Sequence, residues 1–353
     1  MSRIVEERIA DLLSRSEGEG SCYVPRGEGS GAIRRALQRR VAAGTVVSPA
    51  PGLFVSSRTW SGLKKNDQML LVVRGLQTMH PNWVFCGPTA ALVYGIDVSF
   101  SLTDNVHLAV APGERGSDHG LVRRHGVLVP GDVDLEVEQH DGIRVTSPEK
   151  TVFDCLRWAD FPHGLGVVDS ALRSGVVRRS ELEEHFQRAS SRLSGKELAL
   201  TTLSWADPRS ENGGESIARG RMLSLGYVCP ELQVEVPRVA GEGRPYRADF
   251  CWVRSDGLVI LGELDGDGKY LEEELMGGRS LGEVLSDENI RGSRFTLYDV
   301  SLMRFRFGVT DDPVAFASVL DEYGVPKRGS DLALPDGTPM IPNWAALRRA
   351  AHE

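Results

Sequence analysis

The sequence lacks any apolar run of about 18 residues, the length that a membrane-spanning helix requires, so no membrane span is expected. The first residues, MSRIVEERIADLL, place Glu6, Glu7 and Asp11 among their apolar positions and therefore lack the apolar core of a signal peptide. Cysteine is scarce too, with five residues in 353 and no C-x-x-C pair, which argues against a disulfide framework or a zinc ribbon. These absences indicate a protein of the reducing cytoplasm.

Two large enzyme classes, the P-loop nucleotide-binding enzymes and the H-E-x-x-H zinc proteases, are not indicated, because neither G-x-x-x-x-G-K-[ST] nor H-E-x-x-H occurs. What is present is an ordinary globular composition, with 41% hydrophobic and 25% charged residues. The net charge of −8 disfavours nonspecific binding to a polyanion. A local basic patch is nevertheless what meets phosphate, so the distribution of charge matters more than its sum.

The pattern of periodic and turn-forming segments predicts an α/β protein, of the multidomain α+β kind, in four parts. These are a winged-helix DNA-binding domain at 1–60, a mixed α/β domain at 61–206, a nuclease-like α/β domain at 207–325 and a tail at 326–353. The stretch DPRSENGGES, residues 207–216, is the best candidate for a linker. The tail at 326–353 is expected to be mostly loop.

Within these parts, helices are expected at 3–15 and 30–43, followed by a hairpin in TVVSPAPGLFV. In the middle part, VHLAV, GVLV and IRVT read as strands, and Ser147 is expected to cap a helix that starts at Pro148. After the linker we expect helix, strand, strand–turn–strand, helix and strand.

A basic helix is the first functional candidate. Between Gly31 and Pro51 there is no acidic residue, and four arginines share one arc opposite the apolar positions: Arg34, Arg35, Arg39 and Arg40. Helix, turn, basic helix and hairpin is the order of a winged helix, in which such arginines reach phosphates or guanine edges of double-stranded DNA. The alternative is a solvated charged face with no ligand.

The first 200 residues or so resemble the AbiEi family of antitoxin regulators. The resemblance rests on three segments: RRALQRRVAAGTVVSPAPGLFV (34–55), GPTAALVYGI (87–96) and SPEKTVFDCLR (147–157). It implies a winged-helix DNA reader followed by a mixed α/β domain. It also implies repression of the protein's own promoter and pairing with a nucleotidyltransferase toxin.

A set of carboxylates is the second candidate, in RADFCWVRSDGLVILGELDGDGKY, residues 247–270. Two β-prone segments flank Ser255-Asp256-Gly257 as in a hairpin. A two-residue loop would place Asp249 opposite Leu264, whereas a three-residue loop with Gly257 in the left-handed region places it opposite Glu263. In the second case Asp265 joins the same face.

Three carboxylates on one face repel one another unless a cation neutralises them, and oxygen ligands suit Mg²⁺ or Mn²⁺. A metal at Asp249 and Glu263 would activate water and stabilise charge on a scissile phosphate. Glu215 would supply a further ligand or base, Gln233 would orient water, and Lys269 would stabilise phosphate charge. The alternative is that these acids are solvated residues near a turn and a sheet edge.

Residues 210–322 are similar to the Vsr-related branch of the PD-(D/E)XK nuclease superfamily. The similarity rests on GESIARGRMLSLGY, PELQVEV, YRADFCW, LGELDGDGKY and RFRFGVTDDPVAFASVL. It implies a restriction-endonuclease-like fold with Asp249 and Glu263 as metal carboxylates. The sequence departs from the superfamily in having Asp265 where a lysine usually stands. The Vsr-related branch commonly has an acid at that position too.

Three functions stay open at this point. One is a metal-dependent endonuclease that hydrolyses DNA phosphodiesters, in phage defence or repair. Another is an antitoxin-like repressor whose nuclease fold serves as a surface for a homodimer or a toxin. The third is a binder of DNA ends or structures without catalysis.

Overall fold

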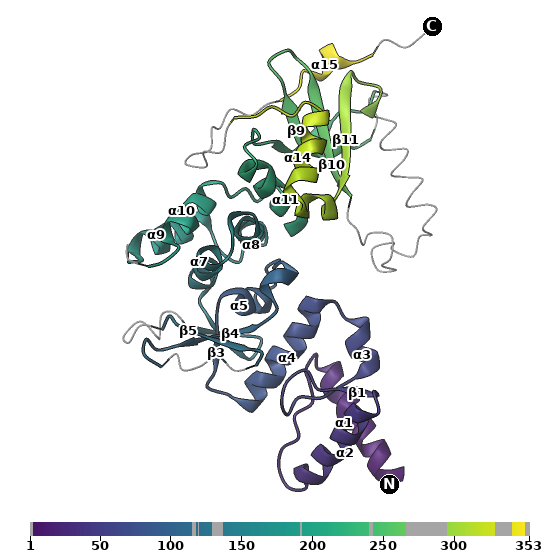
Figure 1. Ribbon diagram of the computed structural model, residues 1–353, viewed down its shortest axis with the longest axis vertical. Coiled ribbons are helices and arrows are strands. Elements are labelled where there is room, and N and C mark those ends of the chain that lie inside the picture. The colour runs from purple at the N-terminus through teal and green to yellow at the C-terminus, as the bar shows by residue number, and fades with distance from the viewer. Residues whose placement is uncertain are drawn as a thin grey trace. The chain divides into compact units, whose positions relative to one another are not determined.

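A computed structural model describes residues 3–114, 118, 120–128, 137–190, 193–239, 243–265, 295–328 and 341–349 (Figure 1), with the side chains from residue 7 onward. The chain forms two compact units. Unit 1 comprises Met1–Trp158 and Ser174–Ser190, and unit 2 comprises Ala159–Arg173 and Ser191–Glu353. The four-part division expected from the sequence stays a prediction.

The two units alternate along the chain because one helix of the middle region packs within unit 2. Helix α8 (Phe161–Arg173) lies against α11 (Gly213–Ser224). A Cβ atom on Gly220 would lie 2.7 Å from the Cα atom of Pro162, so only glycine permits this close approach. The sequence offers this contact no local signal, since the two helices are far apart along the chain.

Unit 1 begins with two helices and a small hairpin. These are α1 (Arg3–Gly18), α2 (Ser30–Ala42) and the antiparallel strands β1 (Val46–Val47) and β2 (Val55–Ser56). Their apolar faces share one core, which includes Ile9, Leu37 and Phe54. The expected order of helix, basic helix and hairpin is confirmed, while the name winged helix stays a proposal.

A five-stranded mixed sheet forms the rest of unit 1, in the order β5-β4-β3-β7-β6. Its strands are β3 (Val84–Phe85), β4 (Val106–Val110), β5 (Val122–Gly126), β6 (Val137–His140) and β7 (Ile143–Thr146). Unit 1 also holds α4 (Lys65–Met79), α5 (Gly87–Val93) and α7 (Pro148–Trp158), with a 3₁₀ turn η1 at Phe100–Leu102. Helix α3 (Ser57–Gly62) packs on the hairpin of β1 and β2, and α9 (Arg179–Arg188) packs on α7.

Two local expectations in unit 1 meet different outcomes. Ser147 caps α7 as expected, because the Lys150 backbone N–H donates to its hydroxyl at 3.3 Å. The strand expected at GVLV is wrong for Val127 and Leu128, since β5 ends at Gly126; Val129 lies outside the described residues. Strand β5 instead pairs over its full length with the five residues of β4, which fixes its end.

Unit 2 holds α8, α10 (Lys196–Ser204), α11 and a four-stranded sheet in the order β11-β10-β9-β8. The strands are β8 (Glu231–Val236), β9 (Tyr246–Val253), β10 (Val259–Asp265) and β11 (Val300–Arg306), of which only β10 and β11 run parallel among the described pairs. The turn η2 (Phe307–Asp311) and helices α14 (Pro313–Glu322) and α15 (Trp344–Leu347) follow.

Both faces of this sheet are covered. Trp252, Ile260 and Met303 pack against α11 and α14 on one face. On the other face, Cys251 and Leu261 pack in a cluster that Trp344 of α15 also joins. The α/β character of the region is confirmed. In the tail, the described residues hold one short helix, α15, and the expectation that the tail is mostly loop stays a prediction. A helix expected before the last strand would fall at 266–294, outside the described residues.

The hairpin between β9 and β10 has the three-residue loop. The Arg254 backbone N–H donates to the Leu258 carbonyl at 2.9 Å, and Gly257 has a φ of 86°. The pairing of β9 with β10 extends from Val253 and Val259 to Phe250 and Gly262, and the Asp249 carboxylate beyond it accepts from the Leu264 backbone N–H at 2.8 Å. The expected pairing of Asp249 with Glu263 stays a prediction. The alternative with a two-residue loop is wrong.

The expected linker is partly wrong, because α11 already begins at Gly213. The residues before it are anchored rather than left to solvent. The Asp207 backbone N–H donates to the Asp169 carboxylate at 2.7 Å, and the Arg173 guanidinium donates to the Ser210 carbonyl at 2.8 Å. The Gly, Ser and Asn residues here serve to start a helix, which composition alone did not distinguish from a linker.

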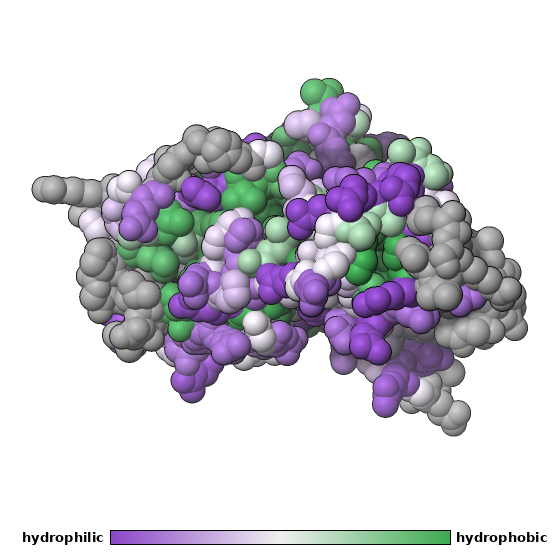
Figure 2. Space-filling model, turned by 90° about the horizontal axis from the view of Figure 1, so that it is seen from below, coloured by the Kyte–Doolittle hydropathy of each residue, from purple (hydrophilic) through white to green (hydrophobic). Residues whose placement is uncertain are grey.

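Among the described helices none is long and apolar enough to cross a membrane. Hydrophilic and apolar residues are mixed on the face shown in Figure 2, and hydrophilic ones prevail. Single exposed apolar side chains such as Val314, which is 80% exposed, are ordinary on such a surface.

Candidate functional site

The basic helix of unit 1 presents its arginines as expected. Arg34, Arg35 and Arg39 are exposed, and Ala36 and Leu37 on the opposite side are buried. Arg40 differs, because it is half-buried and its guanidinium donates to the Ala36 carbonyl at 3.4 Å. Three guanidinium groups on one arc are suited to phosphate oxygens along a nucleic-acid backbone.

The helix and its hairpin belong to a cross-linked scaffold. The Glu17 carboxylate, at the end of α1, accepts from the Ser56 backbone N–H at 2.7 Å and from the Thr59 hydroxyl at 2.6 Å. The Ser57 hydroxyl donates to the Gly44 carbonyl at 2.7 Å, just after α2. These bonds fix the end of the basic helix relative to the hairpin.

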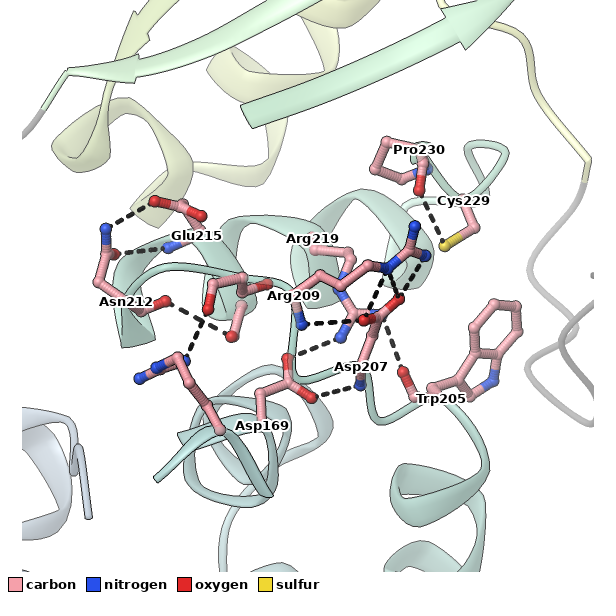
Figure 3. Close-up of polar contacts among 12 residues, drawn as sticks. Asp169, Trp205, Asp207, Arg209, Asn212, Glu215, Arg219, Cys229 and Pro230 are labelled. Carbon is pink, nitrogen blue, oxygen red and sulfur yellow. Dashed lines mark hydrogen bonds and ion pairs between the residues drawn. The ribbon is translucent and has the colours of Figure 1, made fainter. Parts of the chain in front are cut away.

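In unit 2 the residue that organises the acidic site is Glu215, which is 3% exposed in the first turn of α11. Its backbone N–H donates to the Asn212 side-chain oxygen at 3.0 Å, and the Asn212 amide donates back to its carboxylate at 2.7 Å (Figure 3). The Glu211 backbone N–H and the Gln233 amide donate to the other carboxylate oxygen at 2.7 and 3.0 Å. The structure thus brings the expected residues Glu215 and Gln233 together.

The protonation of Glu215 is shifted towards neutral pH. Burial raises the pKa of this carboxyl group to about 7, and the negative charge of nearby Asp249 adds to the rise. The three donated hydrogen bonds favour the ionised form and limit the shift. Glu215 can therefore exchange a proton at physiological pH, which an ordinary surface glutamate does not do.

Strands β8 and β9 both change face at the positions of Gln233 and Asp249. Leu232 and Phe250 belong to one side of the sheet, whereas Val234 and Ala248 belong to the other. Gln233 has a φ of 52°, in the left-handed region that a side chain with a Cβ atom rarely adopts.

The Asp249 carboxylate accepts from the Leu264 backbone N–H at 2.8 Å, so it reaches across to β10. Together with the bond from Gln233 to Glu215, this joins α11, β8, β9 and β10 at one place. Backbone strain of this kind concentrates at functional sites.

The strain at Gln233 can be measured by comparing two substitutions. Gln233→Ala removes the amide and keeps a Cβ atom, whereas Gln233→Gly removes both. We expect the glycine variant to be more stable than the alanine variant by about 1 kcal/mol, because glycine adopts a positive φ without a steric penalty. Chemical denaturation followed by a probe in unit 2 measures this difference, and an alanine variant at least as stable would contradict the assignment of strain.

The other predicted carboxylates lie on β10. Glu263 is 2% exposed, and Asp265 forms an ion pair with Arg304 at 2.7 Å. Arg304 is the register partner of Glu263 on the parallel strand β11. The sequence reasoning missed this arginine, which is 39 residues from Asp265 in the chain.

These positions limit what a metal could use. Among the described residues, no three or more His, Cys, Asp or Glu side chains form a group that could hold a metal ion. Asp265 is engaged with Arg304, so the expected set of three carboxylates is not assembled. Asp249 and Glu263 remain as a candidate pair, and Mg²⁺ can be bound through one or two carboxylates with waters and substrate phosphate. Lys269 lies outside the described residues.

A network of hydrogen bonds and ion pairs holds the segment that leads into α11 in place (Figure 3). The Arg219 guanidinium pairs with Asp169 at 2.7 Å and donates to the Trp205 carbonyl at 2.8 Å, and both charged side chains are at most 2% exposed. Asp207 binds Arg209, which also pairs with Glu231 at the start of β8. Breaking a buried pair by removing one partner costs about 3–5 kcal/mol. This network fixes the start of α11 and hence the position of Glu215.

Comparison with known proteins gives one family match. Residues 83–198 match the family model for the AbiEi antitoxin C-terminal domain. Two uncharacterized proteins of Mycobacterium tuberculosis, from strains CDC 1551 and H37Rv, are each 32% identical to this chain over 169 residues. The aligned residues are 48% of this chain and 58% of each relative, so less than two thirds of the relatives is spanned. The resemblance to AbiEi antitoxins is thereby confirmed for residues 83–198. The nuclease-like domain expected at 207–325 lies beyond the matched residues and stays a prediction.

Proposed function

We propose that this chain is a DNA-binding regulator of the antitoxin type, which represses its own promoter and pairs with a nucleotidyltransferase toxin in the cytoplasm. The observation that carries the proposal is the match of residues 83–198 to the AbiEi antitoxin C-terminal domain. A module with an exposed basic helix and a hairpin precedes those residues in the chain, in the order of a winged helix.

In this function the two parts of unit 1 have different tasks. Arg34, Arg35 and Arg39 contact DNA phosphates, while residues near the start of α2 read base edges in the major groove. The AbiEi-like region serves the toxin. Unit 2 then acts as a surface for a second copy of the chain or for the toxin.

The test is a reporter fused to the DNA upstream of the gene. Expression of the full chain is expected to lower reporter output, and co-expression is expected to restore growth of cells that carry a neighbouring nucleotidyltransferase. A variant with Arg35→Ala and Arg39→Ala is expected to lose repression and to keep the rescue of growth, because the DNA and toxin functions use different residues. Unchanged reporter output with the wild-type chain would contradict the proposal.

A second candidate function is a metal-dependent endodeoxyribonuclease in unit 2. The observation that favours it is the convergence of Glu215, Gln233 and Asp249, with Asp249 hydrogen-bonded to the residue next to Glu263 on β10. Asp249 and Glu263 would hold Mg²⁺ or Mn²⁺, which when bound would activate water and stabilise negative charge on phosphate.

In that chemistry the chain's own residues have defined tasks. Glu215 accepts a proton when it is ionised, and Gln233 orients the Glu215 carboxylate through the hydrogen bond that its side-chain amide donates at 3.0 Å. Lys269 keeps its predicted role as a phosphate contact. Asp265 has no direct role, because its charge is neutralised by Arg304.

A further inference from the structure

The acidic face of β10 has an internal source of positive charge. Glu263 and Asp265 lie two residues apart on β10 and therefore on one face, and the Asp249 carboxylate accepts from the backbone N–H of Leu264 between them at 2.8 Å. Like charges on neighbouring positions of a sheet destabilise it, the more so because Glu263 is buried. A fold that keeps these residues needs a nearby cation.

The geometry points to Arg304. Its position opposite Glu263 on β11 puts both side chains on the same face of the sheet, because register partners on parallel strands are neighbours. Its guanidinium is 2.7 Å from the Asp265 carboxylate, and the two side chains are 29% and 27% exposed. At this exposure solvent screens the pair less than it would at an open surface.

We propose that Arg304 is a positioning residue that balances the charge of this carboxylate face and so takes over part of the role of a divalent cation. Because Arg304 pairs with Asp265, that carboxylate is not available to coordinate a metal ion, and only Asp249 and Glu263 could act as metal ligands. The inference concerns the same carboxylates as the second candidate function, but it holds whether or not the protein cleaves DNA.

The experiment follows the opening of β10 in the full chain by hydrogen exchange, read by mass spectrometry on peptides that cover 259–265. Arg304→Gln is expected to speed exchange in these peptides by roughly fivefold, since an ion pair is lost and like charges are left together. Millimolar Mg²⁺ is expected to reverse most of that change, because a cation that binds the closed form stabilises it. Arg304→Lys keeps a positive charge and is expected to stay near the wild type.

Arg254→Gln is the matched control. Arg254 pairs with Asp256 at the same distance of 2.7 Å and is 34% exposed, but it lies at the turn before β10. We expect no effect of Mg²⁺ on exchange in this variant. If Arg304→Gln and Arg304→Lys speed exchange equally, or if Mg²⁺ leaves Arg304→Gln unchanged, Arg304 acts by packing and the proposal is overturned. Cleavage of DNA is not read, so a protein that does not cut DNA leaves this outcome unaffected.

Discussion

Replacing Arg35 and Arg39 by alanine is expected to weaken binding to double-stranded DNA by roughly tenfold to a hundredfold at moderate salt. Both arginines are exposed on α2, one helical turn apart. Each phosphate contact contributes about 0.9 to the slope of log K against log salt, so we expect the slope to fall by about 2. Fluorescence anisotropy of a labelled duplex over a range of salt concentrations measures both quantities.

The control for this prediction removes the same charge elsewhere in unit 1. Arg178, the N-cap residue of α9, and Arg188 in its last turn are 80% and 69% exposed and pair with Glu181 and Glu184. Their double alanine variant is expected to keep the wild-type slope. If the two double variants lower affinity and slope equally, DNA binding reflects total charge and the basic helix has no special role.

Loss of Glu215 is the second large effect, and it tests the candidate nuclease. If unit 2 cleaves plasmid DNA with Mg²⁺ or Mn²⁺, Glu215→Gln is expected to slow cleavage by about 10²- to 10⁴-fold, the range for a general acid or base. Glu263→Ala is expected to be at least as severe, because it removes one of two proposed metal carboxylates.

The pH dependence follows from the pKa of Glu215, which is raised to about 7. A base must be ionised, so the wild-type rate is expected to rise as pH increases through about 7 and then to level off. Glu235→Gln on β8 is the control, since Glu235 is exposed and outside the cluster. Cleavage that Glu263→Ala leaves intact would exclude this site, and a flat pH profile would exclude Glu215 as the base.

The same raised pKa predicts that the stability of the fold decreases as pH rises, whereas the cleavage rate is expected to increase. The unfolded chain ionises Glu215 near 4.5, whereas the folded chain holds its proton up to about 7. Between these values the folded state binds more protons, so its stability falls as pH rises. Once Glu215 is fully ionised above pH 7, the free energy of unfolding is lower by about 3 kcal/mol, because a difference of one unit between the folded and unfolded pKa corresponds to about 1.36 kcal/mol.

Local rules predicted the parts of the fold that depend on neighbouring residues. The residues Ser255-Asp256-Gly257 predicted the hairpin and narrowed its loop to two lengths, and the positive φ of Gly257 with the bond from Arg254 to Leu258 shows the three-residue one. Ser147 and Pro148 set the start of α7 in the same way. Periodicity located the basic helix and its buried side.

The rest depends on contacts between distant segments. Arg304 meets Asp265 only because β11 lies parallel to β10, and no local pattern sets that pairing. Helix α8 belongs to unit 2 because Gly220 allows it to approach α11 closely. The positive φ of Gln233 is equally invisible in sequence, since a glutamine is not a residue that signals such a conformation.

The most direct test of the proposed function compares two labelled duplexes of equal length, one from the DNA upstream of the gene and one with the same bases scrambled. The full wild-type chain is expected to bind the upstream duplex at least about 10³-fold more tightly at physiological salt, as specific DNA-binding proteins do. Equal affinity for both duplexes across all salt concentrations, or no binding to either, would contradict a role as a DNA-binding regulator.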